Sequence, residues 1–176
     1  MTLEGNSIRI NPQPCSFLEE DLVDKCPFCN ILSGNLEGTI IYQDEICTAI
    51  MDIQPINPGH ILVIPNQHIP DLAGLSSDIG KQLFTVGQKL ASALRQSSVH
   101  CEGVNLFLAD GKAAMQDVFH THLHVIPRFE GDGFGFTFSP RYTELPTRDE
   151  LEKIGINLKE ALKIVEKLEE QDDTLT

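Results

Sequence analysis

Residues 120–126 read His-Thr-His-Leu-His-Val-Ile, so three histidines alternate with other residues in a segment rich in strand formers. Side chains two residues apart point to the same face of a β-strand, and we predict that His120, His122 and His124 project together from one strand. Such a group can bind phosphate, bind a metal ion or relay a proton, because imidazole changes charge near neutral pH. A surface strand that happens to be rich in His is the plain alternative. It is disfavoured because half of the six histidines fall within five positions, among apolar residues.

The composition is that of one soluble globular domain. The chain has 176 residues, of which 41% are hydrophobic and 22% charged. No apolar run approaches the roughly 20 residues needed to span a bilayer. The first 24 residues lack the continuous apolar stretch of a signal peptide. We therefore expect a cytoplasmic protein without a membrane partner.

The charge balance is strongly acidic, with 13 Lys and Arg against 26 Asp and Glu and a net charge of −13. Such a field repels the backbones of DNA and RNA, so a nucleic-acid partner is not expected. A small phosphorylated ligand remains compatible if backbone N–H groups, His and a few Arg meet its charge locally. The five cysteines of an expected cytosolic chain argue against a disulfide framework.

The chain reads as an α+β domain with an antiparallel sheet. Residues 1–23 form an N-terminal extension, because Asn-Pro-Gln-Pro at 11–14 breaks any helix. We predict a helical turn at 26–32 and strands at 39–43, 46–51, 61–64, 104–108 and 120–126. A long helix begins near residues 76–78, and its core face is predicted to hold Ile79, Leu83, Val86, Leu90, Ala93 and Leu94.

The last segment, residues 141–176, is predicted to be a C-terminal helix with a frayed tail after Gln171, which leaves the main domain at 24–140. Thr147 and Glu150 fit a capping box at the start of this helix. One helical face then carries apolar residues at Leu151, Ile154, Leu158, Ala161, Val165 and Leu168.

The triad suits nucleotidyl transfer, because a neutral imidazole can attack phosphorus and split one hard displacement into two easier ones. His122 is the central ring and therefore the natural nucleophile. His124 could donate hydrogen bonds to phosphate oxygens or a proton to the leaving group. Gln116, in the preceding loop, could hold a non-bridging oxygen or the incoming water. No Gly-rich phosphate loop and no carboxylate cluster for Mg²⁺ is visible in the sequence.

The triad segment matches the pattern His-φ-His-φ-His-φ-φ, with a loose fit only at Thr121, and resembles the signature of the histidine triad (HIT) superfamily of nucleotide hydrolases and transferases. Within it, the chain is most similar to bacterial zinc-carrying HIT proteins of the Hint and Fhit type. The resemblance covers about residues 24–138. Its further matches, in order and spacing, are Asp52-Ile53, Pro58-Gly59-His60, Leu62-Val63-Ile64-Pro65, His68-Ile69, Gln116 and Pro127-Arg128.

The resemblance implies a two-layer α+β fold, built as a homodimer whose sheets join across the interface. It implies that His122 becomes nucleotidylated at the α-phosphate of a purine nucleotide and that water then releases the mononucleotide. A nucleoside phosphoramidase and a dinucleoside polyphosphate hydrolase are both compatible with it.

The same resemblance implies a nucleotide pocket. Its apolar base-binding residues would be Phe28, Ile31, Ile50 and Ile53, for which plain core packing is the alternative. Asp52 resembles the carboxylate that accepts both ribose hydroxyls, a geometry that suits a carboxylate. His60 is expected to support the active site by hydrogen bonding.

Cys26-x-x-Cys29 has the spacing of a zinc knuckle. The spacing leaves the other two ligands open, and two ordinary thiols or a redox-active pair are alternatives. The resemblance supplies His68 and His120 as the remaining ligands. Two Cys and two His would form a closed tetrahedral site, which indicates structural and not catalytic zinc.

The chain departs from the resemblance just before the triad. Most members carry Gly-Gln followed by Ser or Thr, whereas residues 115–117 here are Met-Gln-Asp, and Ala109 replaces the usual Asn. An ionised Asp117 beside the nucleotide would repel phosphate, and we hypothesise that it steers specificity away from multiply charged leaving groups. Two other hypotheses stay open: a non-catalytic, nucleotide-binding regulatory protein, and a zinc hydrolase in which all three triad histidines bind metal.

Overall fold

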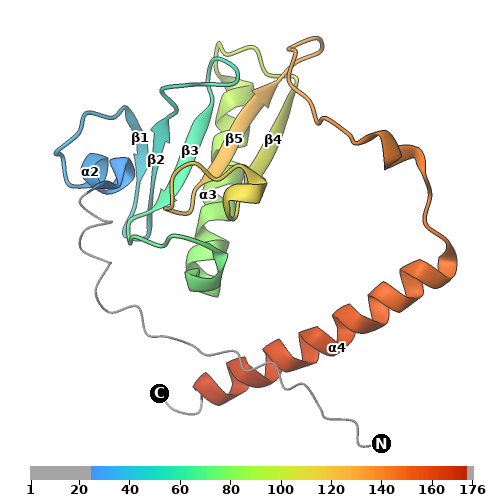
Figure 1. Ribbon diagram of the computed structural model, residues 1–176. Helices are drawn as coiled ribbons and strands as arrows, with labels where there is room; N and C mark the ends of the chain where they lie inside the picture. Colours follow the sequence, from blue (N-terminus) through green and yellow to red (C-terminus); the bar gives the residue numbers. More distant parts are fainter. Residues whose placement is uncertain (1–24, 174–176) are drawn as a thin grey trace, which may run out of the picture. The chain divides into compact units, whose positions relative to one another are not determined.

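The computed structural model describes residues 25–173, and Figure 1 shows their arrangement. The chain divides into two compact units between Phe134 and Gly135. The predicted N-terminal extension (1–23) and the last three residues of the tail lie outside the described residues. The predicted boundary near residue 140 therefore stays a prediction, although the first unit contains the whole triad segment.

The first unit is built on one five-stranded antiparallel sheet of order β1-β2-β3-β5-β4. Four strands agree closely with the predicted ranges and confirm the α+β class. These strands are β1 (Ile40–Gln43), β2 (Cys47–Met51), β3 (Ile61–Pro65) and β4 (Gly103–Leu108). The fifth, β5 (Leu123–Arg128), lies between β3 and β4 and is the strand that extends the triad segment.

One face of the sheet is covered by α3 (Ser77–Gln96), which packs against β2, β3 and β5 (Figure 1). The Ser76 hydroxyl accepts from the Ile79 N–H at 3.4 Å and caps the helix where the sequence predicted its start. The predicted core stripe is confirmed at Leu83, Val86, Leu90 and Leu94, whereas Ala93 is exposed.

The short helix α2 (Pro27–Leu32) begins with Pro27 at its first turn, where the missing N–H costs nothing. It packs over β2 and β3, and its Phe28 is buried in a second apolar cluster with Ile50, Leu62 and Ile64. The sheet therefore has one face filled by α3 and a second face on which α2 and the loops leave room for a site.

The triad segment departs from the prediction of a strand over 120–126. Regular pairing starts only at Leu123, so His124 is the one triad histidine in β5. His120 lies in a bend before the strand, and His122 directly precedes it. The reason is visible in the hydrogen bonds. The His120 Nε2–H donates to the Pro65 carbonyl at 2.9 Å, and the Thr121 N–H donates to the Ile69 carbonyl at 2.6 Å. Ladder pairing with β3 is replaced by these contacts.

The second unit holds a 3₁₀ turn, η3 (Pro140–Thr143), and the helix α4 (Arg148–Asp173). The predicted capping box is confirmed: the Thr147 N–H donates to Glu150 Oε2 at 2.8 Å, and the Glu150 N–H donates to Thr147 Oγ1 at 3.3 Å. The predicted apolar face is largely exposed, with exposed fractions of 49% at Leu151 and 60% at Leu168. Within residues 25–173, no helix combines the length and hydropathy that crossing a bilayer requires.

Candidate active site and metal cluster

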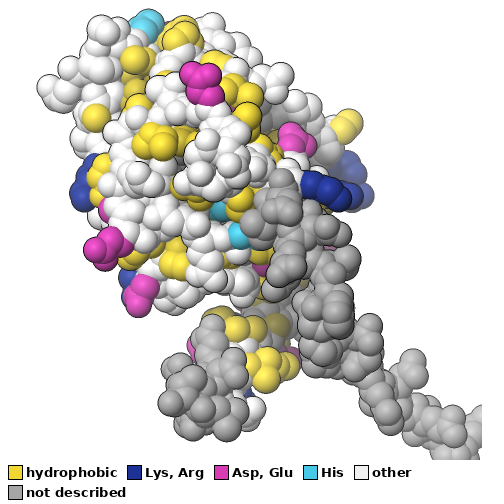
Figure 2. Space-filling view, turned by 90° about the vertical axis from the view of Figure 1, so that its left-hand side faces the viewer, with side chains coloured by type: hydrophobic (Ala, Val, Ile, Leu, Met, Phe, Trp, Pro, Cys, Tyr) yellow, Lys and Arg dark blue, Asp and Glu magenta, His cyan; other side chains and the backbone are white. Residues whose placement is uncertain are grey.

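A cavity of about 490 Å³ opens on the sheet face opposite α3. One side of it is apolar and the other holds the triad end, and Figure 2 shows histidine side chains reaching the surface between hydrophobic ones. The apolar lining includes the predicted base-pocket residues Phe28, Ile31, Ile50 and Ile53, joined by Leu36, Leu62 and Val118. Ile53 is 96% exposed at the rim, so plain core packing does not account for it. The polar lining includes Asp52, His60, Asp117, His122 and His124.

His122 is buried and oriented by the backbone. Its Nδ1 lies 2.7 Å from the His120 carbonyl oxygen. A carbonyl only accepts hydrogen bonds, so Nδ1 carries the hydrogen and Nε2 keeps its lone pair. Burial lowers the pKa of His122 below its ordinary value, so the ring is neutral at pH 7. A neutral imidazole with a free Nε2 at a cavity wall is a nucleophile ready to react.

His124 is linked to a second chain of polar groups. Its Nδ1 lies 3.0 Å from His60 Nε2, and His60 Nδ1 lies 3.1 Å from Asp52 Oδ2. The Ile56 N–H also reaches His60 Nδ1 at 3.2 Å. When this nitrogen accepts from Ile56, His60 carries its hydrogen on Nε2 and donates to His124, whose own hydrogen is then on Nε2. Burial lowers the pKa of His124 to about 4, with the neighbouring His122 adding to the effect.

The turn before β3 places His60 in this chain. Gly59 has φ +94°, a left-handed conformation that favours glycine. A Cβ at this position would also lie 2.8 Å from Val99 Cγ1, so side chains are excluded twice over. The His60 N–H donates to the Asn57 carbonyl at 3.0 Å and closes the turn. The motif Pro58-Gly59-His60 therefore forms a tight turn that places the His60 ring in contact with His124.

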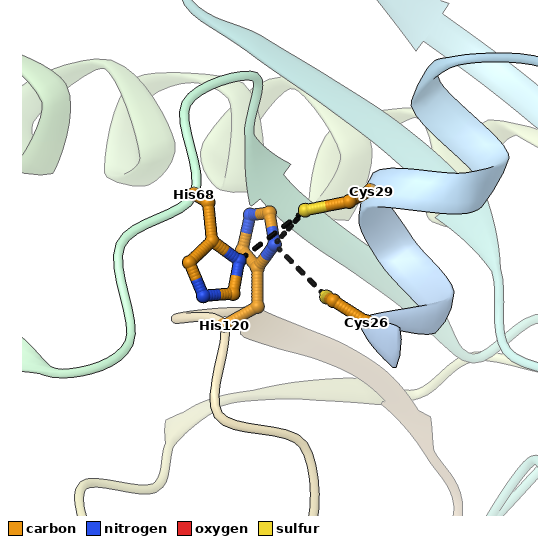
Figure 3. A group of neighbouring side chains, drawn as sticks. All are labelled: Cys26, Cys29, His68 and His120. Carbon is orange, nitrogen blue, oxygen red and sulfur yellow. Dashed lines mark hydrogen bonds between the residues drawn. The ribbon is translucent and has the colours of Figure 1, made fainter. Parts of the chain in front are cut away.

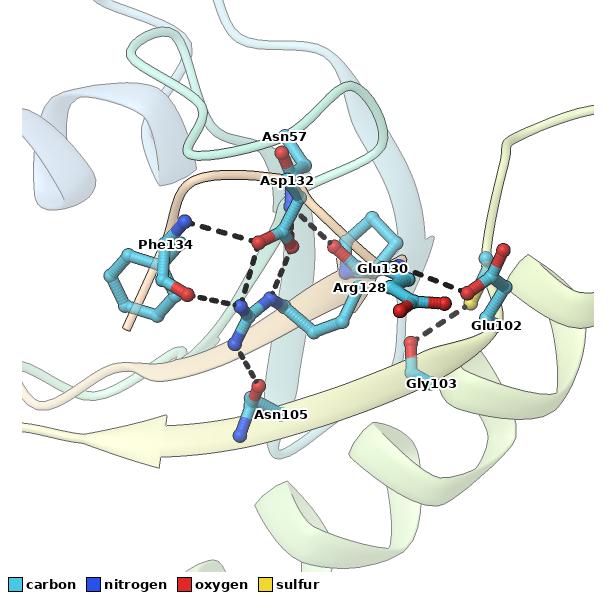
Figure 4. Close-up of polar contacts among 10 residues, drawn as sticks. Asn57, Glu102, Gly103, Asn105, Arg128, Glu130, Asp132 and Phe134 are labelled. Carbon is cyan, nitrogen blue, oxygen red and sulfur yellow. Dashed lines mark hydrogen bonds and ion pairs between the residues drawn. The ribbon is translucent and has the colours of Figure 1, made fainter. Parts of the chain in front are cut away.

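An ion pair fixes the other side of the same turn (Figure 4). Arg128 at the end of β5 pairs with Asp132, with its Nη2 2.8 Å from Oδ1. Asn57 Nδ2 donates to Asp132 Oδ2 at 2.8 Å and to the Pro127 carbonyl at 2.9 Å. The Arg128 side chain holds the pKa of the Asp132 carboxyl far below its usual range. The end of β5 therefore anchors the turn that carries His60.

Gln116 is buried and bonded to the backbone on both sides of its amide. Its Oε1 accepts from the Gly111 N–H at 2.8 Å, and its Nε2 donates to the carbonyls of Pro70 at 2.7 Å and Val118 at 3.2 Å. Gln116 does not line the cavity. In this structure it shapes the loop before the triad, and its predicted contact with substrate stays a prediction.

The neighbours of Gln116 in that loop do line the cavity. Met115 has φ +66°, a strained conformation for a residue with a side chain, and is 74% exposed. This is the position at which the resembling proteins carry glycine. Asp117 is exposed at the cavity wall beside His122. Ala109 is buried, and its methyl side chain has no polar group to offer to the site.

The four predicted metal ligands converge at one end of the triad segment (Figure 3). His120 Nδ1 lies 3.5 Å from both Cys26 Sγ and Cys29 Sγ, and His68 Nδ1 lies 3.2 Å from Cys29 Sγ. Cys26 and Cys29 come from the start of α2, and His68 from the loop after β3. The three triad histidines do not share one centre, because His122 belongs to neither of the two candidate ligand groups found among the described residues.

The donor geometry fits a tetrahedral cation. Bonds of about 2.3 Å to sulfur and about 2.0 Å to nitrogen would separate S and N by about 3.5 Å, close to the separations observed. His120 donates from Nε2 to Pro65, so its Nδ1 lone pair faces the two sulfurs. Burial and the adjacent Cys26 raise the pKa of Cys29 to about 12, so a thiolate pair there needs a compensating cation.

Several residues that shape the site received no role from the sequence. Among them, Leu62 and Val118 line the cavity, the Pro65 carbonyl orients His120, and Asn57 and Asp132 fix the His60 turn. The opposite charges of Arg128 and Asp132 at spacing four were the available signal. The Pro65 carbonyl gave no signal, because a backbone acceptor exists at every residue.

The HIT domain family model matches residues 33–131, and the chain belongs to this family. An uncharacterized HIT-like protein of Borreliella burgdorferi is 42% identical over 63% of this chain and 81% of its own length. Adenylylsulfatase HINT3 of Arabidopsis thaliana is 33% identical over 63% of this chain and 56% of its own length.

Solved structures of the family share the fold. A Zn-bound histidine triad family protein from Mycobacterium smegmatis is 44% identical with a TM-score of 0.62, covering 67% of this chain and 85% of that chain. A histidine triad nucleotide-binding protein from Candida albicans is 30% identical with a TM-score of 0.70, covering 80% of this chain and 99% of that chain. These similarities confirm the predicted family and fold.

Proposed function

We propose that this protein is a nucleotide hydrolase that attacks the α-phosphate of a purine nucleotide conjugate through His122 and releases a nucleoside monophosphate. One observation carries the proposal: the His120 carbonyl holds the His122 Nδ1–H and leaves Nε2 free at the wall of a cavity with an apolar opposite side. Membership of the HIT family supports it, as do relatives named as an adenylylsulfatase and a nucleotide-binding protein.

The cavity suggests how the nucleotide binds. The base lies against Phe28, Ile31, Ile50 and Ile53, where its faces exchange water for apolar contacts. Asp52 is partly exposed at the cavity wall, with one carboxylate oxygen near His60, and accepts the ribose hydroxyls. This arrangement brings the α-phosphate toward His122 and His124.

The reaction proceeds in two displacements. His122 Nε2 attacks phosphorus, the bond to the leaving group breaks, and the leaving group takes a proton from His124 Nε2. Water then attacks the phosphorus of the nucleotidylated His122, and the bond from phosphorus to Nε2 breaks. The proton of the water passes to His124, and the monophosphate leaves with His122 restored. In the tautomer that accepts from the Ile56 N–H, His60 donates from Nε2 to His124 Nδ1 and keeps the hydrogen of His124 on the nitrogen that faces the cavity.

We further propose that Cys26, Cys29, His68 and His120 hold a structural zinc ion. The Zn-bound relative supports this assignment. When bound, the ion supplies charge that stabilises two buried thiolates. The ligand set ties α2, with its cavity residue Phe28, to the segment that carries His122.

We also propose a cytoplasmic homodimer. Within the described residues the four cysteines form no disulfide, as suits a reducing compartment. β4 pairs only with β5 in the described residues and so presents an edge to which a second sheet could join.

A nucleotide-binding regulatory protein is the second candidate. It is favoured by Met115, Asp117 and Ala109, which replace a glycine, a hydroxyl and an amide and leave the phosphate region with fewer donors. The two candidates share the cavity and differ only in turnover.

The deciding experiment follows AMP release from adenosine phosphoramidate, diadenosine polyphosphates, ADP and ATP. We expect release by the native protein, none by His122→Ala, and native rates for His100→Ala, which changes an exposed histidine away from the cavity. Absence of release together with measurable AMP binding would replace the hydrolase by the regulatory protein. Release that persists in His122→Ala would exclude His122 as the nucleophile.

A further inference from the structure

We infer that Asp117 selects substrates by the charge of the leaving group, favouring cationic leaving groups over anionic ones. This inference rests on the proposed function and narrows its substrate class to nucleotide conjugates whose leaving group carries no negative charge. It places polyphosphates, whose leaving groups are multiply anionic, among the poor substrates.

The cavity holds negative charge without compensation from the protein. Glu37, Asp52 and Asp117 line it, and none of the described residues that line it is Lys or Arg. A substrate with one charged phosphate can be met by N–H groups of the lining histidines. Each further negative charge adds repulsion from the carboxylates, and no Lys or Arg lines the main cavity to offset it.

Asp117 is the carboxylate best placed to act on the leaving group. Asp52 is assigned to the ribose and is held by the protein, because its Oδ1 accepts from the Gln54 N–H at 2.9 Å and its Oδ2 lies beside His60. Glu37 is next to Gly38, which lies against the apolar Ile31 side chain, whereas Asp117 lines the cavity near His122. The Asp117 carboxylate accepts no hydrogen bond from the described residues, so its charge is available to a ligand.

The neighbourhood of Asp117 gives the leaving group a place. A second hollow, of about 220 Å³, shares Pro27, Asp117 and Val118 with the main cavity and is otherwise lined by Lys25, Cys26, His68, Pro70 and Phe119. Lys25 is an exposed cation of this hollow and does not line the main cavity. Asp117 thus forms a shared wall between the nucleotide cavity and this hollow. A group attached to the α-phosphate at His122 and extending away from the base passes this carboxylate.

An amine can leave from the α-phosphate by the same displacement at phosphorus. The P–N bond breaks as the bond from phosphorus to His122 Nε2 forms, and the departing nitrogen takes its proton from His124. A second, protonated amino group on the leaving amine would approach Asp117 with favourable charge. A carboxylate at the same position would be repelled. At partly solvated separations each unit of charge changes the rate by about tenfold.

The test compares three adenosine phosphoramidates with leaving amines of similar length: 1,2-diaminoethane with a free cationic end, propylamine, and β-alanine with an anionic end. We expect kcat/KM to fall in that order in the native protein, by about 100-fold from cationic to anionic. In Asp117→Asn, which keeps the shape and removes the charge, the ratio should shrink to about tenfold or less. Added salt should shrink the native ratio in the same direction.

Glu166→Gln is the matched control, because it removes one negative charge from an exposed position on α4, in the other unit. It should keep the native ratio. Asp117→Ser provides a second variant with the residue type of the resembling proteins, and it should behave as Asp117→Asn does. A ratio unchanged in both Asp117 variants would overturn the charge selection while leaving the hydrolase intact. No AMP release from any of the three compounds by the native protein would instead overturn the proposed function.

Discussion

His120 and His122 are two residues apart, and both rings are buried, yet the backbone fixes them in opposite tautomers. His120 donates from Nε2 to the Pro65 carbonyl, so its Nδ1 lone pair faces Cys26 and Cys29. His122 donates from Nδ1 to the His120 carbonyl, so its Nε2 lone pair faces the cavity. The same side chain is thereby prepared for a metal ion at one position and for phosphorus at the next. The role of each ring depends on which of its two nitrogens donates to a backbone carbonyl, because the other nitrogen keeps the lone pair.

The largest expected effect is a loss of activity without a loss of metal when the ring of His122 is removed and that of His120 is kept. His122→Ala should lower AMP release by at least about 10⁴-fold, because no other group replaces the nucleophile. The same variant should keep its metal content, measured by elemental analysis, and its affinity for AMP. A parallel loss of metal would mean that the two sites are not separate.

Removal of a cluster ligand should have the converse result. Cys29→Ala is expected to lower the metal content from about one ion per chain toward zero and to reduce the free energy of unfolding by about 3–5 kcal/mol. Cys101→Ala, at a half-buried thiol outside the cluster, is the matched control and should retain the metal. A native metal content in Cys29→Ala would contradict the ligand assignment.

His124 sharpens the comparison, because a side chain and not a carbonyl orients it. His60→Ala removes the partner at 3.0 Å and should lower kcat by about 10–100-fold, with little change in KM. His60→Gln, which can still donate to His124 Nδ1, should recover part of the loss. Equal rates for both variants would show that His60 acts only by filling space.

The smallest expected effect concerns pH. Burial lowers the pKa of His124 to about 4 from the 6.5 of a free imidazole, so the unfolded chain binds this proton first as the pH falls. Stability that is present above pH 6.5 is therefore lost between pH 6.5 and 4. Urea unfolding should show about 2 kcal/mol less loss from pH 7.5 to 5 in His124→Gln than in the native protein. The exposed His100→Gln should leave the pH dependence as it is.

The sequence predicted the parts of the molecule that depend on periodicity and spacing. The antiparallel strands, the cap at Ser76 and the Thr147–Glu150 box follow from local patterns, and all are present in the structure. The convergence of Cys26, Cys29, His68 and His120 was also expected, although only through the family resemblance. Local spacing alone paired the two cysteines and left the histidines open.

The remainder depends on tertiary contacts that no local pattern encodes. The strand was predicted three residues too early, because the His120 ring takes the Pro65 carbonyl that a ladder bond would have used. The contact of Gln116 with substrate stays a prediction, whereas the bonds of its amide to three backbone groups of the surrounding loops were not predicted. Polar side chains near a site have many partners within reach, and the path of distant loops decides among them.

The two carbonyls that set the triad tautomers have a consequence for mutational robustness. Every residue keeps its main-chain oxygen when its side chain changes, so the acceptors of His120 and His122 survive substitution at neighbouring positions as long as the backbone path is kept. The orientation of His124, by contrast, depends on the identity of residue 60. Among related sequences, the first two rings should therefore tolerate changes around them, and variation in catalytic behaviour should accumulate at the third.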